Sequence, residues 1–288
     1  MSNKLNVRGL GYHIHQWGEP KNPKIFAIHG WMDSGASFQY IASNLAKTFH
    51  IIAPDLRGFG NSGHDVNGYW FPDYFADLEV ILNHYSANQK VNLLGHSMGG
   101  NIVLLYAGIR PNRVEKVFSL DALGIQQTTP NDSAMKYRQW LDQIEKQTPE
   151  KTYPDIQTFE QSIQRNHPRL SDDTIRFLAK SWSKQNHQGE FILRHDKKHL
   201  NTNPIRYNHD DITAIWGQIE ARVGLLMAED SPIYQQYVTS SRLEHARKLL
   251  NISDQDYHCI QSCGHMVHLE QPTKTASCIN SFFKSEDS

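Results

Sequence analysis

The chain places a serine between two glycines where a predicted strand meets a predicted helix. Ser97 is the centre of Gly95-His96-Ser97-Met98-Gly99, which follows the apolar run 91–94 and begins the helical pattern of 98–109. A G-x-S-x-G pentapeptide in this setting makes so sharp a turn that the serine hydroxyl stands clear of the sheet edge. The first N–H groups of the new helix also point toward the atom that the serine attacks. The pattern therefore predicts that Ser97 is a catalytic nucleophile.

A serine hydroxyl needs a general base, and the sequence offers one near its end. His265 lies in the segment 262–272, on the loop that follows the predicted strand 257–261. Because the carboxyl ends of parallel strands meet at one edge of a sheet, we expect His265 at the same edge as Ser97. His265 is the predicted base, whereas His268 is expected to pack or to support its neighbours.

Three carboxylates compete to orient the base. Asp230 is the first choice, because it follows the predicted strand 222–228 and lies between the serine and the histidine in chain order. Glu229 has a longer side chain, but alternation along a strand turns it to the opposite side. Asp121, at the end of the predicted strand 114–120, is the second candidate. The acid therefore stays open among these three residues, with Asp230 preferred.

Two backbone N–H groups are predicted to stabilise the negative charge that develops on the attacked carbonyl. One belongs to Met98, and the other belongs to Trp31 in His29-Gly30-Trp31, on the loop after the predicted strand 24–28. Each such donor typically contributes roughly 3–4 kcal/mol to transition-state stabilisation. His29 is expected to support this loop through hydrogen bonds.

The elements around these residues alternate between strand and helix, which is typical of a parallel α/β sheet. Residues 5–18 are predicted to form a hairpin, an antiparallel edge before the parallel strands. Further strands are predicted at 24–28, 50–53, 91–94, 114–120, 222–228 and 257–261, and helices at 37–48, 73–85, 98–109, 240–250 and from Pro272. Between 124 and 216 the pattern changes to helical windows at 132–147, 156–165 and 171–183, with no buried strand. We predict a core of 1–124 and 217–288 with a helical cap inserted over 125–216.

Composition describes an ordinary globular protein. The 288 residues are 39% hydrophobic and 20% charged with a net charge of −1, which argues against nucleic acid as a partner. No apolar run approaches the ~20 residues that span a bilayer, and the N-terminus does not resemble a signal peptide. Three cysteines favour a reducing compartment, and the cytoplasm is the expected location. No metal is expected at Cys259, Cys263, His265 and His268, because strand alternation buries the first and catalysis uses the third.

These motifs together resemble the α/β-hydrolase superfamily, and the chain is similar to its capped serine-hydrolase-like branch. The matching segments are 29–31, 54–62, 95–100 and 264–272, in that order. The resemblance implies a mostly parallel, eight-stranded-type sheet covered by helices, with an inserted helical cap. It also implies structural roles for Asp55 and Arg57. The chain departs from the family at the usual place of the acid, where it has Ser231.

We expect hydrolysis of an ester or related acyl bond in a small, partly apolar molecule, through an acyl-enzyme and without a cofactor. Dehalogenation and epoxide opening are disfavoured, because they use a carboxylate where this chain has Ser97. Carbon–carbon bond hydrolysis, perhydrolysis and acyl transfer stay open, as does a non-catalytic ligand-binding role. The sequence does not indicate an oligomeric state.

Overall fold

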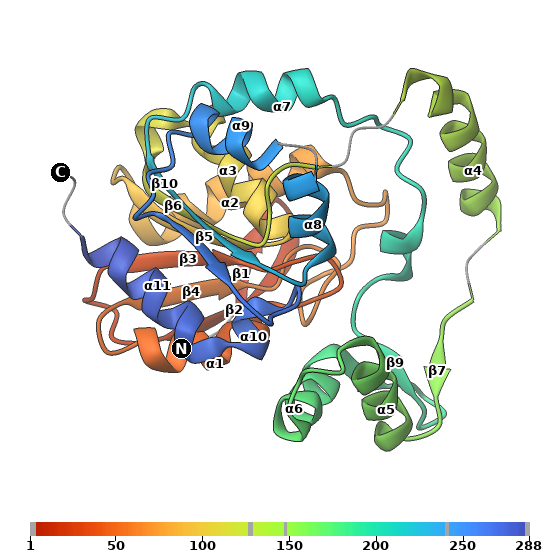
Figure 1. The fold of residues 1–288 in the computed structure, drawn as a ribbon. Coiled ribbons are helices and arrows are strands. Elements are labelled where there is room, and N and C mark those ends of the chain that lie inside the picture. The colour runs from red at the N-terminus through yellow and green to blue at the C-terminus, as the bar shows by residue number, and fades with distance from the viewer. Residues whose placement is uncertain (1–3, 126–128, 147–148, 240–241, 286–288) are drawn as a thin grey trace.

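The computed structural model describes residues 4–125, 129–146, 149–239 and 242–285. An eight-stranded sheet crosses the core in the order β1-β2-β4-β3-β5-β6-β10-β11 (Figure 1). Its strands are β1 (Lys4–Val7), β2 (Leu10–Trp17), β3 (Lys24–Ile28), β4 (His50–Pro54), β5 (Val91–His96), β6 (Val114–Leu120), β10 (Arg222–Ala228) and β11 (Tyr257–Ile260). β2 pairs antiparallel with β1 and β4, and all pairs from β4 to β11 are parallel. The predicted hairpin edge and mostly parallel sheet are confirmed.

Helices cover both faces of this sheet. The helices of the core are α1 (Gln39–Leu45), α2 (Phe71–Ser86), α3 (Met98–Ile109), α8 (Pro232–Thr239), α9 (Arg242–Leu249), α10 (Val267–Glu270) and α11 (Pro272–Lys284), with short 3₁₀ turns η1 (Gly35–Phe38) and η2 (Pro111–Arg113). Alternate residues of β3 enter different cores: Phe26 and Ile28 pack with α2 and α3, and Ile25 and Ala27 pack with α1 and α11. Burial on both faces explains why the strand sequences are continuously apolar.

The segment between β6 and β10 forms a lobe beside the core (Figure 1). The lobe contains η3 (Pro130–Asp132), α4 (Ser133–Glu145), β7 (Thr152–Tyr153), α5 (Ile156–Asn166), α6 (Asp172–Trp182), β8 (Ser183–Gln185), β9 (Phe191–Leu193) and η4 (Lys197–Leu200), and the segment ends with α7 (His209–Trp216). Helices α4, α5 and α6 lie in the three predicted helical windows, whereas α7 was not predicted from the sequence. The sequence does not reveal the separate antiparallel sheet β7-β9-β8, because strands of two or three residues are too short to show an alternating pattern.

The lobe packs directly on the loop that carries His265. Its apolar cluster contains Phe159 and Ile163 of α5 with Leu178 of α6, and it also includes Met266 and Leu269. Those last two residues come from the core, immediately after His265. The lobe and the histidine loop therefore share one hydrophobic cluster.

Helix α7 differs from the rest of the insertion, because it packs on the core. Ile212 and Trp216 are buried in the cluster that also holds the side chains of α2 and α3. The approach to α3 is close: a Cβ on Gly108 would lie 2.1 Å from the carbonyl oxygen of Ile215. The predicted cap range 125–216 thus includes a helix whose apolar face belongs to the core.

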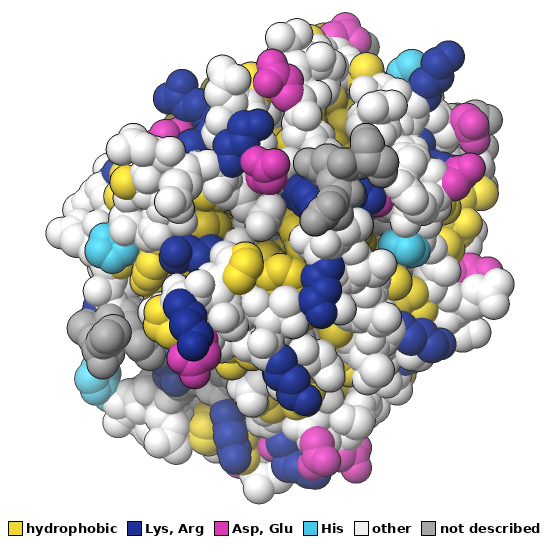
Figure 2. Space-filling model, turned by 90° about the vertical axis from the view of Figure 1, so that its left-hand side faces the viewer, with side chains coloured by type: hydrophobic (Ala, Val, Ile, Leu, Met, Phe, Trp, Pro, Cys, Tyr) yellow, Lys and Arg dark blue, Asp and Glu magenta, His cyan; other side chains and the backbone are white. Residues whose placement is uncertain are grey.

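The end of the molecule away from the lobe carries Lys and Arg side chains among acidic and apolar ones (Figure 2). Here Lys116 and Arg222 reach the C-terminal helix, and both donate hydrogen bonds to Ser285. These charges lie at the amino ends of the parallel strands, opposite the edge where Ser97 is found. In the described part of the chain, no helix is both long and apolar enough to cross a membrane.

Candidate active site

Ser97 lies at the turn between β5 and α3 in a strained conformation. Its φ of 53° and ψ of −117° lie outside the regions that non-glycine residues favour. The neighbouring glycines are required sterically, because a Cβ on Gly95 would lie 2.3 Å from the carbonyl oxygen of Gly99. A Cβ on Gly99 would lie 2.0 Å from the carbonyl oxygen of Ile28. The pentapeptide thus forms the predicted elbow and holds the serine at the carboxyl edge of the sheet.

His265 reaches Ser97 from the connection between β11 and α10. Its Nε2 lies 2.9 Å from Ser97 Oγ, within hydrogen-bond distance for proton transfer. The backbone of the same residue is fixed by His96, whose Nε2 donates to the His265 carbonyl oxygen over 2.9 Å. The two residues that the sequence assigns as nucleophile and base are therefore in contact.

The carboxylate next to His265 is that of Asp121, which corrects the preference for Asp230. His265 Nδ1 donates to Asp121 Oδ2 over 2.6 Å, and the carboxylate is fully buried. Asp230 instead forms an ion pair of 2.8 Å with Arg169, with 40% of its side chain exposed. Glu229 accepts a hydrogen bond from the backbone N–H of Ser262 over 3.3 Å. Asp121, which the sequence offered as the second candidate, is thus the carboxylate that contacts His265.

The turn after β10 explains why Asp230 points away. The backbone N–H of Asp230 donates to the Cys263 carbonyl, and that of Ser231 donates to the Ala228 carbonyl. This turn brings the buried Ser231, one residue later, to Asp121, and Ser231 Oγ donates to Asp121 Oδ2. A serine at the usual place of the acid, opposite an aspartate ending the neighbouring strand, is the signal that could have identified Asp121.

The two residues predicted to supply the oxyanion donors lie near the serine. Met98 is the first residue of α3, so its N–H has no acceptor within the helix. The loop of Trp31 runs past the nucleophile, since a Cβ on Gly30 would lie 3.2 Å from Ser97 Cβ. His29 holds this loop as expected: Nδ1 donates to the Gly30 carbonyl, and Nε2 accepts from the Leu56 N–H. Burial lowers the pKa of His29 to about 4, so the ring is neutral at pH 7.

Other charged residues of the motifs have structural surroundings. His268 is fully buried beside Ser37, 3.3 Å from its hydroxyl, and burial lowers the pKa of its ring to about 3. Arg57 forms a buried ion pair with Asp77, with donor–acceptor distances of 2.6 and 2.7 Å. Among the described residues, the two cysteines of the predicted 259–268 cluster do not gather with His265 and His268 into a metal-binding group.

Two cavities meet at Ser97. The cap cavity, of about 510 Å³, lies against the lobe and includes Ser97 and His265; apolar and polar side chains both line it, among them Phe159, Ile163, Leu193, Asn166 and His167. The second cavity, of about 580 Å³, runs from Ser97 toward α8 and is lined by residues such as Phe71, Ile125, Ile233 and His209. Trp31 lines both cavities. A molecule bound at Ser97 therefore has room on both sides of the serine.

Comparison with known proteins agrees with this architecture. The profile of the family described as alpha/beta hydrolase fold matches residues 23–272. A serine hydrolase-like protein of Danio rerio is 27% identical over 282 residues, which cover 94% of this chain and 84% of that protein. A hypothetical protein of Pseudomonas aeruginosa PAO1 has the same fold, with a TM-score of 0.87, 23% identity, and coverage of 98% of this chain and 99% of that one. The thioesterase domain from the curacin biosynthetic pathway follows with a TM-score of 0.82, 21% identity, and coverage of 96% and 97%.

The profile match extends from the strand before the Trp31 loop to the start of the last helix, so it spans every element that positions Ser97, His265 and Asp121. The chain belongs to the α/β-hydrolase fold family.

Proposed function

We propose that this protein is a serine hydrolase that cleaves an ester or related acyl bond of a small, partly apolar molecule. The observation that carries the proposal is the continuous hydrogen-bonded chain from Ser97 through His265 to Asp121, with distances of 2.9 and 2.6 Å. A nucleophile, a base and an orienting acid in this geometry form the arrangement used for acyl transfer to serine. The name of the Danio rerio relative, a serine hydrolase-like protein, supports the same class.

The proposed reaction has two steps. Ser97 Oγ attacks the carbonyl carbon while His265 Nε2 takes its proton, and Asp121 stabilises the imidazolium through Nδ1–H. The oxyanion lies between the N–H groups of Trp31 and Met98 and then collapses as His265 protonates the leaving group. In the second step His265 removes a proton from water, which attacks the acyl-enzyme and releases the acid. His265 carries each proton between Ser97, the leaving group and water, so the proposed reaction needs no cofactor.

The two cavities support an acyl substrate with groups on both sides of the bond. Their apolar side chains can bind hydrocarbon, while Asn166, His167 and His209 offer hydrogen bonds. A thioester is included among the related acyl bonds, since a structure of similar fold is named a thioesterase. We also propose the cytoplasm as the location, because the three cysteines are free thiols in the structure.

The test is pre-steady-state hydrolysis of chromogenic p-nitrophenyl esters of increasing acyl length. We expect a burst of nitrophenol in proportion to enzyme, followed by slower turnover, and covalent labelling of Ser97 by a fluorophosphonate probe. The matched control is Ser97→Ala, which should show neither the burst nor the label.

Labelling that persists in Ser97→Ala would place the nucleophile elsewhere. Binding of the ester without any turnover would favour the non-catalytic reading. Inactivity on all esters with retained fluorophosphonate labelling would direct the search to acyl transfer, perhydrolysis or carbon–carbon bond cleavage, which use the same three residues.

A further inference from the structure

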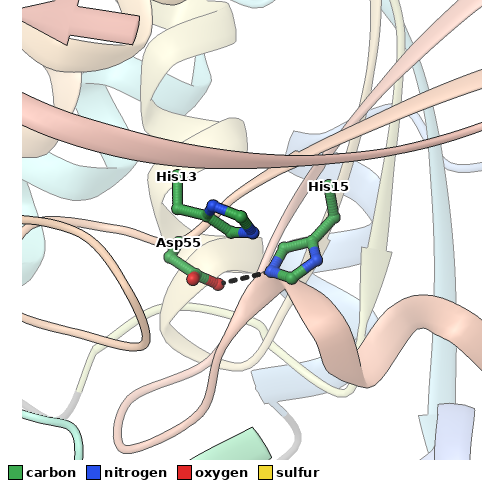
Figure 3. Close-up of side chains that lie close together, drawn as sticks. All are labelled: His13, His15 and Asp55. Carbon is green, nitrogen blue, oxygen red and sulfur yellow. Dashed lines mark hydrogen bonds and ion pairs between the residues drawn. The ribbon is translucent and has the colours of Figure 1, made fainter. Parts of the chain in front are cut away.

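A second cluster of reactive side chains lies apart from the residues that line the two cavities at Ser97. His13 and His15 of β2 meet Asp55, which directly follows β4, and Figure 3 shows the two rings and the carboxylate turned toward one another. The proposed hydrolysis uses none of the three. Imidazole nitrogens and a carboxylate oxygen are the donors that divalent transition metals prefer.

The sheet register brings these residues together. His13 and His15 are two positions apart in a strand, so their side chains share one face. β2 pairs antiparallel with β4, and the backbone N–H of Asp55 donates to the His13 carbonyl over 2.8 Å. The grouping joins positions 40 residues apart. For that reason the sequence, from which no metal was expected, does not display it.

The donor atoms lie close enough to share one ion. One ligand atom from each residue lies within 4.8 Å of the others, and His15 Nε2 lies 3.0 Å from Asp55 Oδ1. Metal–ligand bonds of about 2.0–2.2 Å place neighbouring donor atoms roughly 3–3.5 Å apart. The ring of His13 lies edge-on to that of His15 with centroids 4.6 Å apart, and binding would draw its donor atom closer to the other two.

The carboxylate is already held by the protein around it. Asp55 Oδ1 accepts from the Gly35 N–H over 2.8 Å, and Oδ2 accepts from the Asn61 N–H over 2.9 Å. The ring of His15 is stacked on Trp17 at 5.9 Å between centroids. Metal sites are commonly built this way, with outer hydrogen bonds that fix the orientation of each ligand. His13 and His15 are only partly buried, which leaves the ion a route from solvent.

We propose that His13, His15 and Asp55 bind one divalent transition-metal ion, with Zn²⁺ as the expected occupant and water as the fourth ligand. The ion joins the N-terminal hairpin to the loop that follows β4. Since Asp55 also accepts from Gly35, which follows the Trp31 loop, the ion stabilises the base of that loop without entering the reaction. Its role is structural.

Among the described residues, Asp33, His96 and His268 form a second group that could hold a metal ion. All three side chains are buried, which gives an ion no direct route from solvent. His96 Nε2 also already donates to the His265 carbonyl. The cluster of His13, His15 and Asp55, in which the two histidines are partly exposed, is therefore the one that the geometry favours.

The experiment is calorimetric titration of the full-length, tag-free and chelator-treated protein with Zn²⁺, with Co²⁺ absorption as an independent readout of the ligand field. We expect one ion per chain and a higher unfolding temperature with Zn²⁺. His13→Ala and His15→Ala should each weaken binding by at least about 100-fold and remove the thermal shift. The matched control is His84→Ala, which removes an exposed histidine of α2 and should leave both readouts unchanged.

Circular dichroism of each apo variant separates loss of a ligand from loss of folding. If one variant at β2 unfolds, the other decides the outcome alone. The proposal is wrong if the wild type binds no Zn²⁺, or if a folded β2 variant binds as the wild type does. It is also wrong if His268→Gln abolishes binding while His13→Ala keeps it, since the ion then belongs to the buried group.

Discussion

Asp121 shows how a single carboxylate is positioned by three different partners. Its Oδ2 accepts from both His265 Nδ1 and Ser231 Oγ, and its Oδ1 accepts from the Ala228 N–H over 3.1 Å. Its own φ of 46° is unusual for a residue other than glycine. Hydrogen bonds from the neighbouring strand therefore hold both oxygens in place before any substrate arrives.

The first prediction at this scale concerns the acid. Asp121→Asn should lower kcat by up to ~10⁴, because the amide favours the wrong imidazole tautomer. Asp230→Asn and Glu229→Gln are the matched controls and should retain near-normal kcat, since neither side chain contacts the histidine. Steady-state kinetics on a p-nitrophenyl ester measures all three. A collapse in Asp230→Asn with normal turnover in Asp121→Asn would reverse the assignment.

Ser231→Ala extends the same series to the residue that positions the acid. Losing a hydrogen bond to a charged, buried acceptor should cost about 1.5–3 kcal/mol in the free energy of unfolding. We also expect a lower kcat with nearly unchanged KM, because Ser231 does not face the cavities at Ser97. A fall in stability with an unchanged kcat would limit Ser231 to a purely structural role.

At the scale of elements, one hydrogen bond joins the lobe to the oxyanion loop. Trp182, at the end of α6, donates through Nε1 to Asp33 Oδ1 over 2.9 Å. Asp33 also accepts from the Ser34 N–H and the Ser37 hydroxyl. Burial nevertheless raises the pKa of Asp33 from 3.8 to about 6. The contact between lobe and core therefore includes a carboxyl group that changes its charge near pH 6.

This raised pKa predicts how stability depends on pH. Between about pH 4 and pH 6 the folded protein holds a proton on Asp33 that the unfolded chain has lost. The stabilisation that comes from protonated Asp33 is therefore complete below about pH 4 and is lost as the pH rises through 6. The difference between the two pKa values corresponds to about 3 kcal/mol. Urea unfolding from pH 4 to pH 7 should show that the wild type loses this amount relative to Asp33→Asn. Parallel pH profiles for the two proteins would contradict the prediction.

The described part of the molecule has three hydrophobic clusters. Two of them lie on the two faces of the eight-stranded sheet, and the third lies at the lobe. The third cluster holds Met266 and Leu269, so the lobe also supports the histidine loop. The core on the α3 side includes Ile212 and Trp216 of α7. Removing the insertion therefore has different consequences depending on where the deletion ends.

Two deletions test this division. One removes 126–208 and keeps α7, and the other removes 126–216, with the same short linker in both. The second should be less stable by at least about 3 kcal/mol, because it also removes the buried Trp216 side chain. Both should lose selectivity among acyl chains, since the lobe side of the cap cavity is gone. Equal urea midpoints for the two proteins would mean that α7 belongs energetically to the lobe.

Features that depend on nearby residues could be predicted from the sequence. The continuous apolar runs defined the parallel strands, and the two glycines around Ser97 defined the elbow, because each signal is a local requirement of backbone geometry and burial. His265 could be placed for a similar reason, since it lies on the loop that follows a recognisable strand at the same sheet edge.

The tertiary structure decided what depends on contacts between distant segments. Asp230 and Ser231 are adjacent in the chain, yet Ser231 turns to Asp121 while the backbone N–H of Asp230 donates to the Cys263 carbonyl and its side chain pairs with Arg169. The closeness of His13 to Asp55 depends on the register between β2 and β4. A one-residue change in a turn or a ladder reverses the direction of a side chain, and no short sequence pattern records that choice.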